Sequence, residues 1–561
     1  MRNSRKTTSL YIFCLLITMV ACQPKGNKIG ADISQAQDQI LAGKAIFQNQ
    51  CSTCHNFKDN AIGPNLSGLT RQVDSEWIKG FIKNPSAFFD DEDERALALL
   101  ATYKTPMPAF GSLSEPDLDA LLSYMHTFAT PAEQVALLEN KNWIEEGIED
   151  SGIRIEIEEF FQLPASDTVP PLAKMTKMEP IPGTDRLMIN DQRVGIYEVI
   201  GSEPKLFLNL KDKMDKLVSK PGWGTGLGSF AFHPDYLENG LFYTAHTEPG
   251  GSAIPDTGYT DSLKVFMQWV LTEWKNEEPE STLFEGEFRE LLRIDIPSQA
   301  HGMQELAFNP TAKKGEEDYG LLYIGFGDGG TVEQGFANIS YNQGSDLYSS
   351  ILRIDPLGRN SDNGKYGIPE VNPFFGQEGK AGEVYANGFR NPNRLFWDQV
   401  GNFYATDIGQ HTIEEINRIE PGKFYGWPFR EGTFEINPYG NFREIFPLKE
   451  GDGGLDVTYP IVQMEHDELA AIFAGYFVDE GVLSGNLIFG DILSGRLFHA
   501  NFNENPRPTI YSWKVMVDGQ EMTLAEMVGE GNRVDLKFGK DAEGNIYIMS
   551  KTEGKVFRMR L

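Results

Sequence analysis

Hydrophobic and polar positions follow two different patterns along this chain. In the N-terminal quarter, apolar residues recur at helical spacing, as Leu118, Leu121 and Met125 do within a helix expected over residues 115–128. From Leu172 onward, short apolar runs alternate with turns rich in Gly, Pro, Asp and Asn, and long helices disappear. The pattern predicts a small all-α domain followed by a large all-β region.

Four segments of the β region resemble one another. Each reads as a strand, a turn bearing Gly or Asp, and a second strand that contains an aromatic residue. They span residues 230–243, 306–324, 394–405 and 535–548. Repeated β-hairpins over a long all-β region favour a propeller, and the length allows about six blades with long loops between them.

The strongest chemical signal lies in the helical part, at Cys51-Ser52-Thr53-Cys54-His55. A C-x-x-C-H run attaches a c-type haem through its two thiols, and its histidine ligates the iron. A zinc site needs two further ligands at the usual spacing, and a thioredoxin-like motif needs a βαβ context; the neighbouring sequence offers neither.

A second iron ligand is predicted at Met107, which stands between Pro106 and Pro108. A thioether ligand raises the potential of a haem, and the flanking prolines favour this role over that of an ordinary core methionine. With these motifs, the chain over residues 38–129 resembles class I cytochrome c. The residues that carry the resemblance beside the haem motif are Gly43, Phe47, Gly63-Pro64-Asn65-Leu66 and Trp77.

The N-terminal segment reads as a signal peptide over residues 1–21. Basic residues precede an apolar stretch from Leu10 to Val20, which is too short to span a membrane. The end of the stretch resembles a bacterial lipobox, which makes Cys22 the expected lipidation site; secretion with a cut near Ala21 is the alternative. The protein is therefore expected outside the cytoplasm, in the periplasm or at the outer surface, and held at a membrane only by a lipid.

The formal net charge of -31 narrows the choice of partners. A strongly acidic surface disfavours nucleic acid and anionic lipid. It would steer a basic redox protein toward the chain, although acidic side chains also simply solvate a secreted protein. Residues 130–167, which include an acidic run, are expected to form a linker that is first helical and then irregular. The propeller is expected over residues 168–561.

Motifs in the β region carry a second resemblance, to the glucose/sorbosone dehydrogenase family. This family comprises soluble aldose dehydrogenases that use pyrroloquinoline quinone (PQQ), and the resemblance implies a six-bladed propeller. The motifs occur in the family's order at residues 230–236, 301–308, 325–330, 351–356, 387–392 and 414–428.

Three residues at the matching positions carry the expected chemistry. Oxidation of an alcohol or hemiacetal needs a base for the hydroxyl proton, and a cation that stabilises charge on the electron acceptor. We expect His301 to be the base, Asp328 to orient it, and Arg390 to polarise a quinone carbonyl with Asn391 beside it. The structural alternative is a buried Arg390–Asp328 ion pair with His301 capping a turn.

The resemblance also implies cofactor contacts. For PQQ these are Gln343, Arg390, Asn391, Arg533 and Arg496, the last in place of a missing lysine; for calcium they are the backbone carbonyls near Gly409 and Gln410. The sequence departs from the family pattern, because a glutamine is absent near Gly224 and one of two paired arginines is missing. PQQ carries three carboxylates, so fewer cationic partners should weaken its binding.

Two functions follow from these patterns. The first is a dehydrogenase of an aldose sugar or related alcohol, in which PQQ takes the electrons and haem c passes them to a soluble cytochrome or terminal oxidase. The second is a non-enzymatic propeller that binds carbohydrate or protein and tethers a cytochrome. The fused haem favours the first, and the missing basic residues favour the second.

Overall fold

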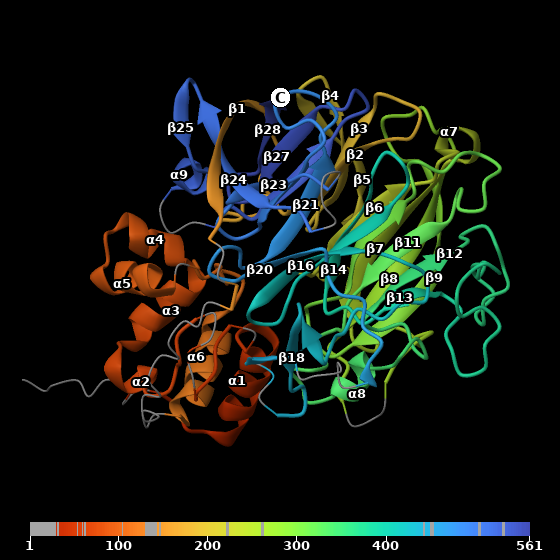
Figure 1. Ribbon diagram of the computed structural model, residues 1–561. Coiled ribbons are helices and arrows are strands. Elements are labelled where there is room, and N and C mark those ends of the chain that lie inside the picture. Colours follow the sequence, from red (N-terminus) through yellow and green to blue (C-terminus); the bar gives the residue numbers. More distant parts are fainter. Residues whose placement is uncertain are drawn as a thin grey trace, which may run out of the picture.

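The computed structural model describes residues 30, 33–52, 54–58, 60, 63–103, 105–128, 143–144, 147–219, 224–259, 263–440, 442, 444–448, 454–502, 507–529 and 533–561. The predicted signal peptide and Cys22 lie outside these residues. A small helical domain (red to orange in Figure 1) lies against one side of a large β domain, as the sequence pattern predicts.

The helical domain is built around two crossing helices. Gly43 and Ala120 mark the crossing, because a Cβ at Gly43 would lie 1.8 Å from the Ala120 carbonyl oxygen. Phe47, Leu118 and Leu121 are buried in the core beside it. The helices are α1 (Gln37–Gln50), α2 (Leu69–Gln72), α3 (Ser75–Lys83), α4 (Pro85–Asp90), α5 (Glu94–Tyr103) and α6 (Glu115–His126).

The ends of two of these helices are fixed by side chains. Asp74 accepts hydrogen bonds from two backbone N–H groups at the start of α3. Ser114 and Asp117 form a reciprocal capping box at the start of α6. The second of these caps fixes the start of α6, which directly follows the loop carrying Met107.

The β domain is a six-bladed propeller, which confirms the expected fold class. Each blade is a four-stranded sheet. Blade 1 contains β2 (Met175–Pro180), β3 (Leu187–Asp191), β4 (Gly195–Ile200) and β5 (Glu203–Asn209). Blade 2 contains β6 (Leu227–Phe232), β7 (Leu241–Pro249), β8 (Met267–Asn276) and β9 (Gly286–Ile296). Blade 3 contains β10 (Met303–Phe308), β11 (Leu322–Phe326), β12 (Ser350–Ile354) and β13 (Val384–Asn387). Blade 4 contains β14 (Pro392–Trp397), β15 (Phe403–Asp407), β16 (Ile413–Arg418) and β20 (Val462–Glu465). Blade 5 contains β21 (Ile472–Phe477), β22 (Leu487–Asp491), β23 (Leu497–Ala500) and β24 (Ile510–Val517). Blade 6 contains β26 (Leu536–Lys540), β27 (Ile546–Ser550), β28 (Lys555–Arg560) and β1 (Glu149–Gln162).

Shorter elements decorate the propeller. They are η1 (Leu210–Asp212), α7 (Tyr236–Asn239), α8 (Ala337–Ser340), α9 (Leu524–Val528), β25 (Gln520–Met522), and the small sheet of β17 (Arg430–Glu431), β18 (Phe434–Ile436) and β19 (Ile445–Pro447).

The innermost strands close the ring. In the order β2, β6, β10, β14, β21 and β26, each contacts the next, and β26 returns to β2. The four similar sequence segments form the first two strands of blades 2, 3, 4 and 6. The predicted repeat of β-hairpins is therefore confirmed.

Strand β1 corrects the expected linker. Residues 149–162 are not irregular; they pair antiparallel with β28 and parallel with β24, and so join blades 5 and 6. Ile155 and Ile157 are buried in the core between these blades, while charged residues alternate with them. This period of two is a strand signal that the acidic composition of the segment concealed.

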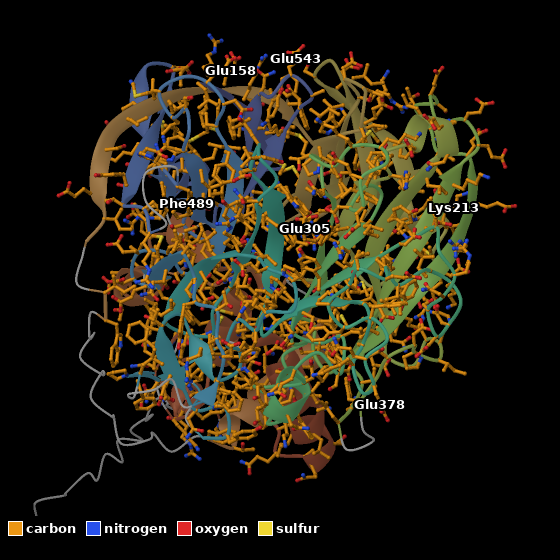
Figure 2. All side chains as sticks on the ribbon, turned by 45° about the vertical axis from the view of Figure 1, so that its right-hand side comes forward. Glu158, Lys213, Glu305, Glu378, Phe489 and Glu543 are labelled. Atoms are coloured by element: carbon orange, nitrogen blue, oxygen red, sulfur yellow. The ribbon has the colours of Figure 1, made fainter. Side chains whose placement is uncertain are left out.

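An ionic network fills the central channel below its mouth. The Lys177 Nζ lies 2.9 Å from Glu305 Oε1, and Arg394 approaches the other oxygen of Glu305. Figure 2 shows Glu305 near the middle of the β domain, whereas Glu158, Lys213, Glu378 and Glu543 lie at its margin. The network links β2, β10 and β14, and thereby holds three inner strands together.

Among the described residues, no helix combines the length and the apolar character needed to cross a membrane.

Candidate active site

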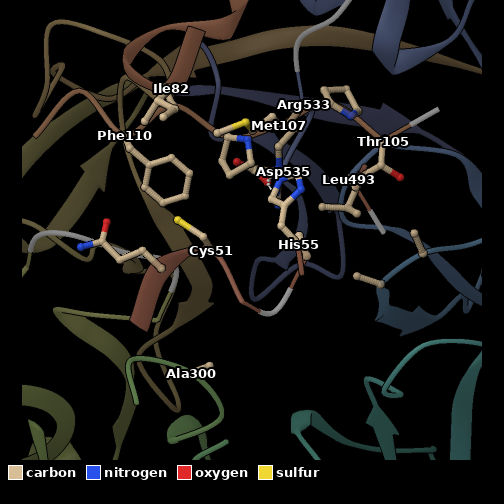
Figure 3. A pocket seen from close by; sticks show the side chains of 18 of the residues that line it. Cys51, His55, Ile82, Thr105, Met107, Phe110, Ala300, Leu493, Arg533 and Asp535 are labelled. Atoms are coloured by element: carbon tan, nitrogen blue, oxygen red, sulfur yellow. Dashed lines mark hydrogen bonds and ion pairs between the residues drawn. The ribbon is translucent and has the colours of Figure 1, made fainter. Parts of the chain in front are cut away.

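One cavity of about 420 Å³ lies where the helical domain meets the propeller. Cys51, His55 and Met107 line it from the helical side, and His301 and Arg390 line it from the propeller. The close view places the first three near Arg533 and Asp535, with Ala300 farther away (Figure 3). The predicted haem motif and the predicted catalytic residues therefore share one cavity.

The residues on the helical side fit a c-type haem. Cys51 and Cys54 are not joined in a disulfide, and burial raises the pKa of the Cys51 thiol to about 12. Apolar side chains complete the walls: Phe47, Ile78, Phe81, Ile82, Leu99, Leu100, Phe110, Leu121 and Met125. Two thiols, an imidazole and a thioether in an apolar crevice are the donor set that a haem with His and Met axial ligands needs.

His55 is held in the orientation of an iron ligand. Its Nδ1 donates a hydrogen bond to the Pro64 carbonyl over 3.0 Å, which leaves Nε2 as the nitrogen with a lone pair. Burial lowers the pKa of His55, which favours the neutral imidazole that a metal requires. Gly63 allows the close approach, because a Cβ there would lie 2.3 Å from His55 Cε1.

The residues on the propeller side come from equivalent places in the fold. Lys174, His301, Arg390 and Arg533 stand just before inner strands β2, β10, β14 and β26. Arg193, Gln410 and Lys551 stand just after second strands β3, β15 and β27. Because these points lie at the same end of each blade, segments far apart in sequence converge on one mouth of the channel.

His301 and Asp328 form the expected pair. The imidazole Nδ1 donates to Asp328 Oδ1 over 2.7 Å, and the second carboxylate oxygen accepts a hydrogen bond from Trp427 Nε1. Burial would raise the pKa of Asp328, but His301, Arg390 and the Gly330 N–H together hold it below the ordinary value. The ionised carboxylate thus fixes the tautomer of His301 and leaves Nε2 as the proton acceptor.

Arg390 is buried, and several hydrogen bonds hold its guanidinium in place. It donates to Gln410 Oε1 over 2.7 Å, to the Gly409 carbonyl over 2.7 Å, and to Glu333 Oε1 over 3.0 Å. Its ion pair is therefore with Glu333, so the structural alternative of an Arg390–Asp328 pair is not formed. Glu333 belongs to no motif, and only the structure identifies it.

Asn391 gives independent support for a ligand at this mouth. It lines the cavity and is 5% exposed, yet its Oδ1 accepts no hydrogen bond in the described part of the chain. A buried amide oxygen without a donor is costly unless a ligand supplies one. The prediction that Asn391 contacts a cofactor is consistent with this position.

Two predicted PQQ contacts are not brought to the cavity. The exposed side chain of Gln343 bonds to the Tyr341 hydroxyl, and Arg496 pairs with Glu468 over 2.5 Å at the surface. Neither residue lines the cavity, so Arg496 does not replace the missing lysine. Both residues lie close in sequence to residues of the site, but their side chains point away from the cavity.

Calcium at Gly409 and Gln410 stays a prediction. Both residues line the cavity, but the Gly409 carbonyl already accepts a hydrogen bond from the Arg390 guanidinium. No group of three His, Cys, Asp or Glu side chains that could hold a metal ion occurs among the described residues. As arranged, the Gly409 carbonyl and Gln410 Oε1 hold the Arg390 guanidinium rather than a metal ion.

The structure supplies basic residues that the motifs did not reveal. Lys174, Arg193, Lys537 and Lys551 join Arg533 on the wall formed by blades 1 and 6. Lys174, Arg193 and Lys551 lie in no sequence motif, and Lys537 lies in a repeated hairpin segment to which no chemical role was assigned. All four reach the cavity because of how the first and last blades meet. Another glutamine, Gln304, lies beside Gly224, where the glutamine of the family pattern is absent. A Cβ at Gly224 would lie 3.1 Å from Gln304 Nε2, and both residues line the cavity.

A second histidine of the propeller also reaches the cavity. His466 Nε2 lies 2.6 Å from Glu414 Oε1, and His466 shares the wall with Gly409 and Gln410. Burial raises the pKa of Glu414 well above its ordinary value. Sequence spacing assigned His466 no role, since its partner stands 52 positions away.

Family models match both parts of the chain. A model described as glucose/sorbosone dehydrogenase matches residues 174–558, and one described as cytochrome c matches residues 40–129.

Among curated proteins, HIPL2 protein of Arabidopsis thaliana is 30% identical over 320 residues, which cover 49% of this chain and 43% of the relative. Hedgehog-interacting protein of Homo sapiens is 28% identical over 387 residues, 66% of this chain and 47% of that protein. Quinoprotein glucose dehydrogenase B of Acinetobacter calcoaceticus is 26% identical over 238 residues, 40% and 45% of the two chains. The chain thus spans less than half the length of these curated relatives.

Solved structures agree on the fold. The apo-form of the soluble aldose sugar dehydrogenase from Escherichia coli superposes with a TM-score of 0.50 at 16% identity, covering 72% of this chain and 99% of that one. At this identity the likeness establishes the propeller fold alone.

Proposed function

Because the chain belongs to the glucose/sorbosone dehydrogenase family and carries a cytochrome c domain, we propose that it is a haem-containing dehydrogenase of an aldose sugar or related alcohol. In this proposal PQQ binds at the mouth of the propeller, and electrons leave through haem c. The observation that carries the proposal is the single cavity lined by His55 and Met107 on one side and by His301 and Arg390 on the other.

His301 is the base of the proposed reaction. Its Nδ1–H is held by Asp328, so Nε2 is the nitrogen that takes the proton from a substrate hydroxyl. Asp328 stabilises the imidazolium that results, and the Trp427 and Gly330 N–H groups keep the carboxylate in place.

Arg390 and Asn391 bind the acceptor. PQQ, when bound, accepts two electrons from the hydroxyl-bearing carbon and returns them one at a time. Arg390 is placed to polarise an acceptor carbonyl, and Glu333 and Gln410 fix the plane of its guanidinium. Asn391 offers an amide whose oxygen has no partner within the described protein.

The surroundings of the enzyme are part of the proposal. A signal peptide and lipidated Cys22 would anchor it to a membrane in the periplasm or at the outer surface, where haem attachment to C-x-x-C-H takes place. A soluble cytochrome or a terminal oxidase would receive the electrons. The acidic surface, with a formal net charge of -31, would favour a basic electron acceptor.

The test is haem reduction in the full, haem-containing protein. The protein is reconstituted with PQQ, with and without calcium, and offered a panel of aldoses and alcohols while the visible haem bands are followed. We expect reduction that requires both substrate and PQQ. Absence of reduction together with absence of PQQ binding in a titration would overturn the proposal.

The second candidate is a propeller that binds rather than oxidises. The alignment to hedgehog-interacting protein extends over 66% of this chain, and Gln343 and Arg496 do not reach the cavity. A propeller of this kind would give no substrate-dependent haem reduction with any quinone.

A further inference from the structure

Five basic side chains line one wall of the shared cavity, at the seam where the first and last blades meet. The group, called here the seam cluster, consists of Lys174, Arg193, Arg533, Lys537 and Lys551. Lys174 precedes β2, Arg193 follows β3, Arg533 and Lys537 flank the start of β26, and Lys551 follows β27. Contact between β2 and β26 brings these four chain segments together.

The seam cluster holds more positive than negative charge. Among the described residues, the carboxylates on the same wall are Asp535, which lies 2.7 Å from Arg533, and Asp167, 3.8 Å from Arg193. Asp191 and Glu305 lie behind the wall and contribute further negative charge to Lys551 and Lys537. Even so, burial and the neighbouring cations lower the pKa values of Lys174, Lys537 and Lys551. Like charges gathered in a cavity are unfavourable until an anion joins them.

The position of the seam cluster relates it to the proposed chemistry. In the ring of inner strands, β2 and β26 lie across the channel from β10 and β14, which carry His301 and Arg390. A flat ligand whose reacting carbonyl is held by the Arg390 guanidinium would extend its opposite end toward the seam. An anionic group at that end is favoured, because the wall carries five basic side chains and two carboxylates among its described lining residues.

We propose that Lys174 and Lys551 of the seam cluster, together with Arg533, bind the carboxylates of the quinone cofactor. This inference rests on the proposed function and names the residues that take over from the lysine and second arginine missing from the sequence motifs. In this proposal the residues that bind the carboxylates lie at the seam between blades 6 and 1, whereas the family pattern has them in loop motifs of the last blades. Lys537, whose Nζ lies 3.6 Å from the centre of the Phe473 ring, forms the floor of the same anchor.

Haem also carries carboxylates, in its propionates, and the seam cluster shares the cavity with the haem ligands. The quinone is favoured because every member of the cluster belongs to the propeller, and because the cluster continues along β26 into the channel at Lys537, away from the helical domain. The two sources are separated by experiment.

The test measures PQQ affinity by titration in the full haem-containing protein, alongside the haem reduction potential without quinone. The variants are Lys174→Met and Lys551→Met, with Lys540→Met as control, because Lys540 ends the same strand β26 but pairs with Asp479 outside the cavity. Methionine nearly keeps the length of the side chain and removes the charge together with its N–H donors. The haem spectrum of each variant reports the folding of the helical domain, and far-ultraviolet circular dichroism reports the folding of the propeller.

We expect each seam variant to bind PQQ at least tenfold more weakly, with an unchanged haem potential and an unchanged Lys540→Met control. Wild-type affinity in both seam variants would overturn the anchor while the proposed function stands. A shifted haem potential with unchanged PQQ affinity would assign the cluster to the haem propionates and also overturn the proposal. No PQQ binding by the wild-type protein would overturn the proposed function itself.

Discussion

His301 illustrates how much one residue depends on its neighbours. It adopts a left-handed backbone conformation, with φ of +54°, and this conformation aims its ring at Asp328 beneath the mouth of the channel. Such a conformation is unfavourable for a residue with a Cβ and persists where the surroundings enforce it. The strain is consistent with a residue positioned for chemistry.

Replacing His301 should remove the base and leave the haem untouched. We expect His301→Ala to slow substrate-driven haem reduction by about 10²- to 10⁴-fold, the range of general-base contributions. The visible haem spectrum should be unchanged. His499→Gln is the matched control, because His499 is buried in blade 5 and does not line the cavity. Wild-type turnover in His301→Ala would remove this residue from the mechanism.

Met107 is expected to set the haem potential. Axial ligands tune haem potentials over about 0.8 V, and a thioether raises the potential relative to other ligands. Met107→Ala should therefore lower the midpoint potential in a redox titration, while the helical domain remains folded. A potential equal to that of the wild type would exclude Met107 as a ligand.

Lys174 should make stability depend on pH in the cofactor-free protein. Burial, with repulsion from Arg193 and Lys551, lowers its pKa from 10.5 to about 7. Between these values the unfolded chain binds a proton that the folded protein lacks, so this residue's contribution to stability rises with pH. The slope reaches at most about 1.4 kcal/mol per pH unit.

Lys174→Met should accordingly be more stable than the wild type at pH 7, and the difference should shrink toward pH 9. Denaturant unfolding of both proteins at the two pH values measures this. A difference that is constant with pH would contradict the lowered pKa. The same substitution is expected to weaken PQQ binding, so stability and affinity should change in opposite directions.

Sequence reasoning reached the residues that sit in motifs and missed those that depend on blade packing. The haem ligands and the His301–Asp328–Arg390 set occupy short runs whose spacing carries the chemistry, and all of them line or adjoin one cavity. Lys174 and Lys551 meet only because the ring closes between β2 and β26. No local pattern records a contact between residues so far apart in the chain.

Among the elements, β1 has the largest structural consequence. Its period-two burial places Ile155 and Ile157 between blades 5 and 6, while its backbone pairs with both β24 and β28. The first two strands of blades 2, 3, 4 and 6 could be predicted from the repeated hairpin segments. The completion of blade 6 could not, since its fourth strand, β1, precedes all the other blades in the sequence.

The stability of the propeller should depend on β1. Ile157 is 2% exposed, and Ile157→Ala should lower the unfolding free energy of the β domain by about 2–5 kcal/mol. Glu159→Ala, on an outward-facing position of the same strand, is the control and should change it little. Far-ultraviolet circular dichroism during denaturation follows the β domain, and the haem bands follow the helical domain. Equal stability of Ile157→Ala and wild type would show that β1 does not contribute to the closed ring.

At the scale of the whole molecule, the helical domain faces one mouth of the propeller across a single cavity. Linker residues reinforce this arrangement, because Glu465 accepts hydrogen bonds from the backbone N–H groups of Trp143 and Ile144. The propeller also approaches the Met107 loop, where a Cβ at Gly111 would lie 3.0 Å from Val169. Electrons released at the propeller would therefore reach the haem within one chain.

The kinetics of haem reduction test this arrangement. With substrate and PQQ in excess, the first-order rate constant should be independent of protein concentration, and added salt should alter it little, because no charged partners must meet. Stopped-flow measurement over a tenfold range of protein concentration distinguishes the cases. A rate constant proportional to concentration would mean that electrons pass between molecules.

The pairing of β1 also has a consequence for the time at which the protein can fold. Gln162 and Glu553 are hydrogen-bonded although they are 391 positions apart, so β1 leaves the ribosome long before its partner strands. At about 5–20 residues per second, synthesis of the intervening chain takes roughly 20–80 seconds. During that interval a bare strand edge invites pairing with other chains, and charged residues are the usual protection. Glu149, Asp150, Glu156, Glu158 and Glu159 make this strand acidic. We therefore expect the acidic side chains of β1 to protect the nascent chain from aggregation during this interval.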